Sequence, residues 1–367
     1  MWKLLTALLG AALSLPVSAA TYVYVSNAED GDIGMYTLTT DGLLQAGPRF
    51  KAGGNVMPMS VSPDKRFLVA AVRSKPFTAH TYGIDRASGA LKQVGSGPLA
   101  ESFPYITFDR KGRFLLGASY AGHLVSVNPV GPDGRVGEPM QVIPTARNAH
   151  AIITDKTNRF AFVPHLGTDQ VFQFLFDEKT GRLSANTPPV LQLKAGSGPR
   201  HLITSPDNRF VYLLNELTAT VSTLALDGTG VLKEVSSASA LPPDSKLSPG
   251  MPRPQQGRDV SNDIWASDIH VTPDGRFLYA AERTSSSIGA FSVDTASGKL
   301  SYLGATPTEK QPRGFRIDPA GRYMVVSGEK SDTISSYAID PSTGELRQLG
   351  KYPTGKGSNW VEIVSFA

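Results

Sequence analysis

Cysteine is absent from this chain of 367 residues, and only 19% of its residues are charged. Without cysteine the protein can form no disulfide, no zinc finger, no thiol nucleophile and no acylated lipoprotein anchor. The formal net charge is only +4, and the lysines and arginines form no basic run, which argues against nucleic-acid binding. Apolar residues make up 40% of the chain, enough to bury a sizeable core, so disorder throughout the chain is excluded.

A long apolar run occurs only near the N-terminus. Lys3 precedes a mostly apolar stretch at 4–15, and Val17-Ser18-Ala19 has the small residues of a signal-peptidase site. A stretch of about twelve apolar residues is too short to span a membrane. We therefore predict a signal peptide over 1–20, a single mature domain over 21–367, and export to a bacterial periplasm with no membrane insertion after cleavage. A buried N-terminal helix is the alternative.

The 36 glycines and 27 prolines punctuate an internal repeat. One phrase, Pro-Asp-x-Arg-Phe-Leu, recurs with variations about every 46 residues, and one interval is longer by about 20 residues. Its arginines are Arg66, Arg113, Arg159, Arg209, Arg276 and Arg322. Each unit has the pattern of an inner hairpin, an alternating strand such as His80–Ile84, a glycine turn and a weaker last strand.

Four strands in a unit of this length predict a blade of a β-propeller. Residues 22–50 look like a blade that lacks its first strand, and Trp360–Phe366 is a spare strand after the last complete unit. Pairing these two ends would give an all-β, seven-bladed propeller and would remove the exposed sheet edges. An open solenoid is the alternative, but it would be expected to carry a polar cap at each end.

The repeat also indicates which side chains surround the central channel. Loops that enter each first strand and leave each second strand lie on the same face of a propeller. The polar residues at these register positions, or beside them, are Arg73, Tyr120, His150, His165, Arg200, His201, Glu216, Ser267, Asp268, His270, Arg283, Arg313 and Glu329. We interpret this varied set as a candidate site, with a wet polar channel as the alternative. The repeat arginines should lie on the opposite face and pair with the turn aspartates.

Glutamate, arginine and histidine together suit the chemistry of an anionic substrate or an oxyanion. A carboxylate or imidazole can move a proton, and guanidinium groups can hold developing negative charge. The chain has no Gly-x-Ser-x-Gly elbow and no cysteine, so a covalent acyl intermediate has little support. His150, His165 and His201 could in principle bind a metal, but no typical ligand spacing supports one. We therefore expect neither a metal nor another cofactor.

Three phrases of the chain, at 198–216, 265–284 and 311–340, resemble the seven-bladed propeller lactonases. That family includes cytosolic 6-phosphogluconolactonases and fungal carboxymuconate lactonising enzymes, and the export signal makes the chain most similar to periplasmic gluconolactonases. The resemblance implies four catalytic residues: His150, Arg200, Glu216 and Arg283. It implies His201, Asp268, His270 and Arg313 as substrate contacts, to which the register adds Arg73 and Tyr120. His165 stands where the family varies, so it is not assigned.

The resemblance implies hydrolysis of D-glucono-1,5-lactone to gluconate by a monomer or weak homo-oligomer whose partner is the small sugar lactone. The proton acceptor is left open between Glu216 and His150. Other hypotheses are 6-phosphogluconolactonase activity, muconate cycloisomerisation and a non-catalytic binding propeller. The polar, proline-rich segment 241–264 is predicted to be either a lid over the site or a loose loop.

Overall fold

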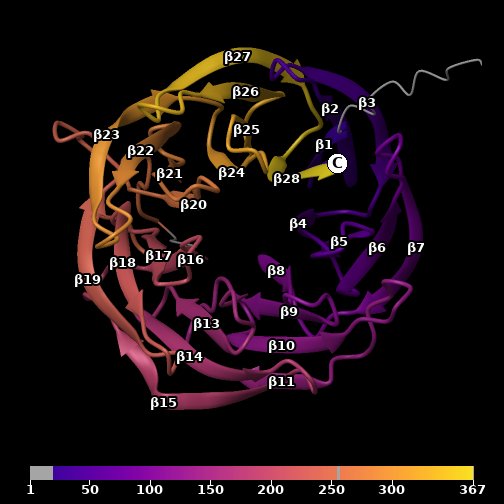
Figure 1. The fold of residues 1–367 in the computed structure, drawn as a ribbon, viewed down its shortest axis with the longest axis horizontal. Coiled ribbons are helices and arrows are strands. Elements are labelled where there is room, and N and C mark those ends of the chain that lie inside the picture. The colour runs from indigo at the N-terminus through magenta and orange to yellow at the C-terminus, as the bar shows by residue number, and fades with distance from the viewer. Residues whose placement is uncertain (1–19, 254–256, 367) are drawn as a thin grey trace, which may run out of the picture.

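The computed structural model describes residues 20–253 and 257–366, and the predicted signal peptide lies almost entirely outside these ranges. Within them the regular elements are all strands, in seven four-stranded antiparallel sheets. The sheets are arranged as the blades of a ring around a central channel (Figure 1). The predicted all-β, seven-bladed propeller is therefore confirmed. None of the described residues forms a helix of the length and hydropathy needed to cross a membrane.

The strands of each blade are given in order from the channel to the rim. Blade 1 consists of β28 (Ser358–Phe366), β1 (Ala20–Asn27), β2 (Asp32–Leu38) and β3 (Leu44–Lys51), and blade 2 of β4 (Val56–Val61), β5 (Phe67–Val72), β6 (Thr78–Ile84) and β7 (Leu91–Pro98). Blade 3 consists of β8 (Tyr105–Phe108), β9 (Phe114–Ser119), β10 (Leu124–Pro129) and β11 (Gln141–Pro144), and blade 4 of β12 (Ile153–Thr154), β13 (Phe160–His165), β14 (Gln170–Asp177) and β15 (Arg182–Gln192). Blade 5 consists of β16 (Pro199–Thr204), β17 (Phe210–Asn215), β18 (Thr220–Leu226) and β19 (Leu232–Ser239). Blade 6 consists of β20 (Ala266–Val271), β21 (Phe277–Glu282), β22 (Ser287–Val293) and β23 (Leu300–Pro307), and blade 7 of β24 (Pro312–Ile317), β25 (Tyr323–Gly328), β26 (Thr333–Ile339) and β27 (Leu346–Pro353).

The apolar run after each repeat arginine forms the second strand of a blade. Strands β9, β13, β17 and β21 are buried along their whole length. They need apolar residues on both faces because each blade packs between two neighbours. Leu214 of blade 5 and Leu278 of blade 6, for example, belong to one buried cluster between those blades. The outermost strands are mostly exposed or half-buried, because they lie at the rim of the ring and meet solvent.

The ring closes through the two ends of the described chain. Strand β28 pairs with β1 in antiparallel register, from Ala20 opposite Phe366 to Asn27 opposite Ser358. Figure 1 shows β28 beside β1 on the inner side of blade 1. The predicted pairing of a spare C-terminal strand with the incomplete N-terminal blade is thus confirmed.

The repeat arginines behave as predicted in three of the six copies. Arg66, Arg209 and Arg276 each pair with the aspartate two residues earlier, at 2.6, 2.6 and 2.9 Å. For the other three copies the prediction is wrong, because their turn aspartate stands four residues before the arginine. At that position Asp109 accepts hydrogen bonds from the backbone amides of Arg113 and Phe114. It therefore caps the turn instead of pairing with a guanidinium group.

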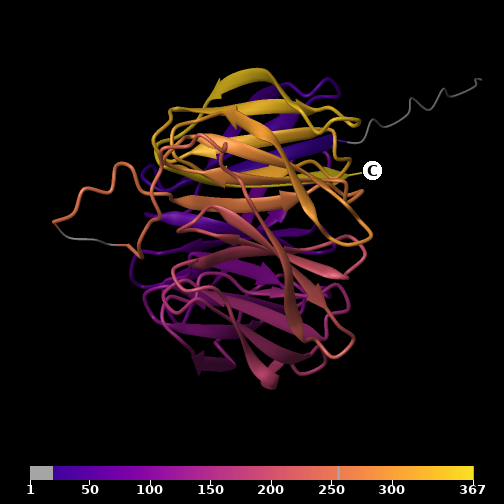
Figure 2. The ribbon, with the colours of Figure 1, turned by 90° about the vertical axis from the view of Figure 1, so that its left-hand side faces the viewer.

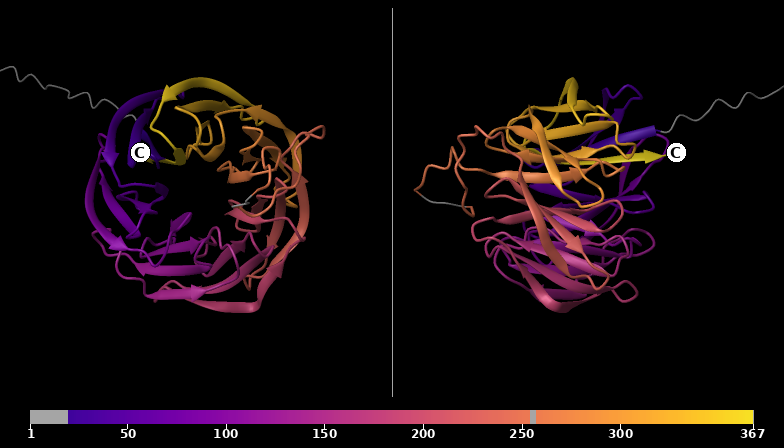
Figure 3. Two further views of the ribbon diagram at one scale, coloured as in Figure 1. Left: turned by 180° about the vertical axis from the view of Figure 1, so that it is seen from behind. Right: turned by 60° about the vertical axis from the view of Figure 1, so that its left-hand side comes forward.

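Segment 241–264 joins β19 to β20 and stands out from the ring at the left of Figure 2 and of the right-hand view in Figure 3. It leaves from the face where the first strands begin, which we call the upper face. Its described part is held in place: the Gly250 amide donates to the Leu217 carbonyl at 2.8 Å, and Arg258 pairs with Asp263 at 2.7 Å. The segment is therefore anchored beside the upper mouth of the channel, while its role as a lid stays a prediction.

Candidate active site

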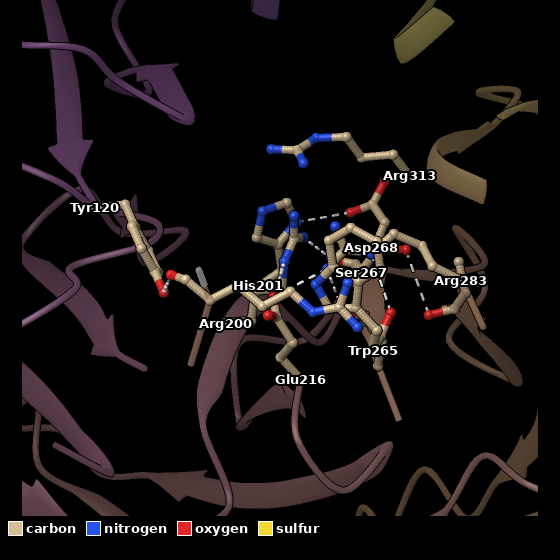
Figure 4. Close-up of polar contacts among 12 residues, drawn as sticks. Tyr120, Arg200, His201, Glu216, Trp265, Ser267, Asp268, Arg283 and Arg313 are labelled. Carbon is tan, nitrogen blue, oxygen red and sulfur yellow. Dashed lines mark hydrogen bonds and ion pairs between the residues drawn. The ribbon is translucent and has the colours of Figure 1, made fainter. Parts of the chain in front are cut away.

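Residues predicted from the register meet at the upper mouth, mainly from blades 5 and 6. Arg200 and His201 lie in β16, and Glu216 directly follows β17. Asp268 lies in β20, and Arg283 directly follows β21. Because first strands begin and second strands end on this face, neighbouring blades bring these side chains together, as Figure 4 shows.

A buried ion network joins blades 5 and 6. Oε2 of Glu216 accepts hydrogen bonds from Nε of Arg200 at 2.8 Å and from Nη2 of Arg283 at 3.1 Å. Arg200 also donates to the carbonyl of Ser267, and Arg283 to that of Trp265. The three charged residues are between 1% and 4% exposed. One carboxylate shared by two guanidinium groups leaves an excess positive charge in the protein interior.

Two further arginines add to this positive charge. Nη1 of Arg313 lies 3.3 Å from Oε1 of Glu329, and Nε of Arg73 donates to the hydroxyl of Ser102 at 2.9 Å. Burial and the charge of Arg313 lower the pKa of Arg73 to about 10. Burial and the neighbouring Arg283 lower the pKa of Arg200 to about 9. Burial is the larger cause of both shifts, and repulsion from the neighbouring arginines adds to it, so a bound anion or oxyanion would be stabilised at this place.

Asp268 holds two histidines. Its Oδ1 lies 3.0 Å from Nδ1 of His201, and its Oδ2 lies 3.2 Å from Nε2 of His270. The backbone amides of Ile269 and Phe315 donate to the same carboxylate. Burial alone would raise the pKa of Asp268, but the facing His270 and the hydrogen bond from His201 outweigh it and hold the pKa well below its ordinary value. Asp268 is therefore an ionised anchor.

His150 faces the same place from blade 4. The predicted first strand of that blade is reduced to the two residues of β12, so His150 precedes it and is held by a backbone hydrogen bond to the Pro164 carbonyl. The ring centroid of His150 is 5.2 Å from that of His201 and 5.6 Å from that of Tyr120. Tyr120 donates its hydroxyl hydrogen to the carbonyl of Arg253 at 2.8 Å, and so connects the mouth to segment 241–264.

His165 is not part of this group. Its ring is fully buried and lies against Phe172 with centroids 4.2 Å apart, and its Nδ1 contacts the Val163 carbonyl. Nowhere in the described ranges do three or more histidine or acidic side chains gather so that they could hold a metal ion. The structure thus gives the metal hypothesis for His150, His165 and His201 no support.

Three aromatic residues around the site were missed by the sequence analysis. Trp265 is stacked between the guanidinium groups of Arg253 and Arg283, at 3.7 and 3.6 Å from its ring centroid. Tyr105 and Trp360 lie edge-on to His201, with centroids 5.0 and 6.0 Å away. Tyr105 stands eight residues before its repeat arginine, as His201 does, so the register contained a signal for it.

Below the arginines the channel widens into a cavity of about 550 Å³ that extends towards the lower face. His201, Asp268 and His270 line it together with Tyr105 and Trp360. Such a volume lies within the range of small-molecule sites. His201 therefore lies at the boundary between the arginine-rich mouth and the cavity.

Three buried histidines should make the folded protein sensitive to acid. Burial lowers the pKa of His165 to about 4 and that of His201 to about 3, and burial together with Arg200 holds the pKa of His150 well below its ordinary value. In the unfolded chain these groups titrate near pH 6.5. Between about pH 6.5 and pH 4 the unfolded chain therefore binds protons that the folded protein does not. As the pH is lowered through this range, the free energy of unfolding should therefore decrease by about 1.4 kcal/mol per pH unit for each histidine.

Thermal unfolding followed by calorimetry across this range would measure the effect. Tm should decline steadily below about pH 6.5, and a His165→Gln variant, which removes one such group outside the mouth, should show a less steep decline. A wild-type Tm that stays constant over the range would contradict the expectation.

Comparison with known proteins extends over the whole ring. The family described as "Lactonase, 7-bladed beta-propeller" matches residues 19–363. A 6-phosphogluconolactonase of Erwinia tasmaniensis is 39% identical over 296 residues, covering 81% of this chain and 84% of that protein. A 6-phosphogluconolactonase of Pectobacterium carotovorum subsp. carotovorum is 38% identical over 298 residues, with the same coverage. The solved structure of a Pseudomonas aeruginosa periplasmic gluconolactonase has a TM-score of 0.82 at 28% identity, covering 95% of this chain and 99% of that chain.

Proposed function

This chain belongs to the lactonase family of seven-bladed β-propellers, and we propose that it hydrolyses D-glucono-1,5-lactone to gluconate in the upper mouth of its channel. The observation that carries this proposal is the cluster of guanidinium groups at the mouth: among the described residues, Arg200 and Arg283 share the carboxylate of Glu216, Arg313 pairs with Glu329, and Arg73 forms no ion pair. Lactone opening creates negative charge first on the attacked carbonyl oxygen and then on the product carboxylate, and fixed positive groups stabilise both.

The reaction needs one water and one proton acceptor. The water oxygen forms a bond to the lactone carbonyl carbon, the acceptor takes a proton from the water, and the carbonyl oxygen becomes an oxyanion. The bond from that carbon to the ring oxygen then breaks, and the proton is delivered to the ring oxygen, which becomes a hydroxyl group. Arg313 and Arg73, which are only partly buried, are placed to meet the oxyanion, while Glu216 keeps Arg200 and Arg283 in position.

Two observations support the unphosphorylated lactone as substrate. The solved relative from Pseudomonas aeruginosa is a periplasmic gluconolactonase. The first twenty residues have the pattern of a signal peptide, and on that basis we also propose a periplasmic location. Phosphorylated sugar lactones are cytosolic metabolites, so an exported enzyme would meet the neutral lactone.

A second candidate is hydrolysis of the 6-phosphate ester of the same lactone. A rim pocket of about 410 Å³ beside the mouth is lined by Arg253, Arg283, Lys310 and Lys330, and the described residues that line it include no carboxylate. Such a pocket could receive a phosphate group. The relatives from Erwinia and Pectobacterium are named 6-phosphogluconolactonases, which also favours this candidate.

Kinetics on three lactones would decide between the candidates. We expect kcat/KM for D-glucono-1,5-lactone to equal or exceed that for its 6-phosphate and that for a muconolactone, after subtraction of spontaneous hydrolysis. The double variant Lys310→Ala, Lys330→Ala should then leave the preference unchanged, because a neutral substrate makes no use of the rim pocket. A preference for the 6-phosphate of tenfold or more that disappears in the double variant would transfer the assignment to the phosphorylated lactone. If the protein accelerates the hydrolysis of none of the three lactones, the non-catalytic binding propeller is the hypothesis that remains.

A further inference from the structure

Two buried imidazole nitrogens at the centre of the site have no hydrogen-bond partner among the described residues: Nδ1 of His150 and Nε2 of His201. The rings that carry them are 5.2 Å apart between centroids, and both side chains are at most 5% exposed. An unpartnered buried nitrogen costs about 1–3 kcal/mol. Two such atoms on neighbouring rings therefore offer acceptors for a bound polar molecule.

Asp268 determines what His201 can do. The carboxylate lies 3.0 Å from Nδ1 of His201 and is itself fixed by the amides of Ile269 and Phe315 and by His270. An ionised carboxylate only accepts hydrogen bonds, so Nδ1 of His201 must carry the hydrogen. The lone pair of the ring is then on Nε2, the atom without a partner. Burial and Arg200 lower the pKa of His201 to about 3, so this lone pair is free at neutral pH.

Glu216 is less suited to accept a proton. Its Oε2 already accepts hydrogen bonds from Arg200 and Arg283, which direct the carboxylate at the two arginines. Protonation of Glu216 would leave two buried guanidinium groups without their counter-ion. Protonation of His201, by contrast, places a positive imidazolium beside the negative Asp268, as in other carboxylate–histidine pairs.

We propose that the water that attacks the lactone is bound between Nδ1 of His150 and Nε2 of His201, and that His201, oriented by Asp268, is the general base. One water hydrogen is donated to each nitrogen, which leaves an oxygen lone pair for the carbonyl carbon. As the carbon–oxygen bond forms, Nε2 of His201 takes its hydrogen as a proton, and it later returns that proton to the ring oxygen as the ring opens. His150 orients the water, and Asp268 is a positioning residue. The kinetic part of this assignment rests on the proposed lactone hydrolysis.

Three variants test the assignment in the full-length protein. His201→Gln should lower kcat for D-glucono-1,5-lactone by about 100-fold or more with KM changed less than threefold, because general base catalysis contributes about that much. His201→Ala should behave likewise and regain activity when imidazole is added, which a structural role would not produce. His80→Gln, in an outer strand of blade 2 and away from the mouth, is the matched control and should keep the wild-type kcat. A His201→Gln enzyme that keeps more than a third of the wild-type kcat would overturn the proposal.

A second measurement does not depend on activity. Nitrogen-15 NMR of histidine side chains should show His201 as the neutral Nδ1–H tautomer at pH 7, and Asp268→Asn should change that tautomer and lower kcat by at least tenfold. A His201 that carries its hydrogen on Nε2 in the wild-type protein would overturn the proposal even if the kinetic variants failed to fold. If the wild-type protein opens no lactone while the tautomer is as expected, the proposed function fails and the geometry of the histidine–aspartate pair stands.

Discussion

Glu216→Ala is expected to lower the free energy of unfolding by about 3–5 kcal/mol and to reduce lactone opening by 100-fold or more. Glu216 is the counter-ion of both Arg200 and Arg283, and all three side chains are buried. Removal of the carboxylate leaves two uncompensated guanidinium groups in the interior, which costs about that much free energy. The same change frees Arg200 and Arg283 from their fixed directions and so disturbs the positive mouth in which Arg313 and Arg73 would meet the oxyanion. Loss of fixed oxyanion stabilisation costs about 10²–10³ in kcat.

Calorimetry and the lactone assay measure the two effects together. A loss of 3–5 kcal/mol corresponds to about 4–7 °C in Tm for a chain of this size. Glu329→Ala is the matched control, because the Arg313–Glu329 pair is longer, at 3.3 Å, and its members are partly exposed. Its effect on Tm should be less than half as large. Equal and small changes in both variants would show that the network between blades 5 and 6 does not stabilise the protein as described.

Deletion of residues 358–367 is expected to abolish folding. The deletion removes β28, which pairs with β1 along eight residue pairs and buries Val361, Ile363, Val364 and Phe366. Burial of each such side chain contributes about 1.5–3 kcal/mol. Their sum is comparable with the whole stability of a typical domain, about 5–15 kcal/mol. Loss of the strand also exposes the inner edge of β1, which invites pairing with other chains.

Expression and size-exclusion chromatography of the truncated protein would show the outcome, and aggregated or unfolded protein is the expected result. Addition of a synthetic peptide with the sequence of residues 358–366 during refolding should recover soluble ring. Ser365→Ala, which removes a side-chain hydrogen bond to Thr21 without removing the strand, is the control and should fold normally. A soluble truncated protein with wild-type Tm would show that ring closure is dispensable.

The repeat predicts where the backbone of each site residue lies, but it does not predict the direction of the side chain. The register placed Arg200, Glu216, Asp268 and Arg283 at one face, because first strands begin and second strands end there. It could not show that Glu216 bonds both arginines at the same oxygen, since that depends on side-chain directions from two blades. His165 stands one register position before the equivalent of Glu216, and its ring turns into the packing against Phe172.

The sequence by itself determined the architecture. A repeat of about 46 residues with turn signals at fixed offsets favours a closed ring over an open solenoid, since each blade must cover its neighbours and the incomplete N-terminal blade can pair with the spare C-terminal strand. It also determined which residue types surround the mouth, and the lack of cysteine excluded a thiol nucleophile among them.

Only the tertiary structure decided which of those side chains contact one another. The hydrogen bonds from Asp268 to His201 and from Arg283 to Glu216 join blades 5 and 6 across 67 positions of the chain, and the bond from Arg200 to Glu216 lies within blade 5. Such contacts depend on the distance between blades and on the rotamers that burial allows, and the spacing of a repeat specifies neither of them. For that reason the sequence left the proton acceptor open between Glu216 and His150, whereas the geometry points to His201.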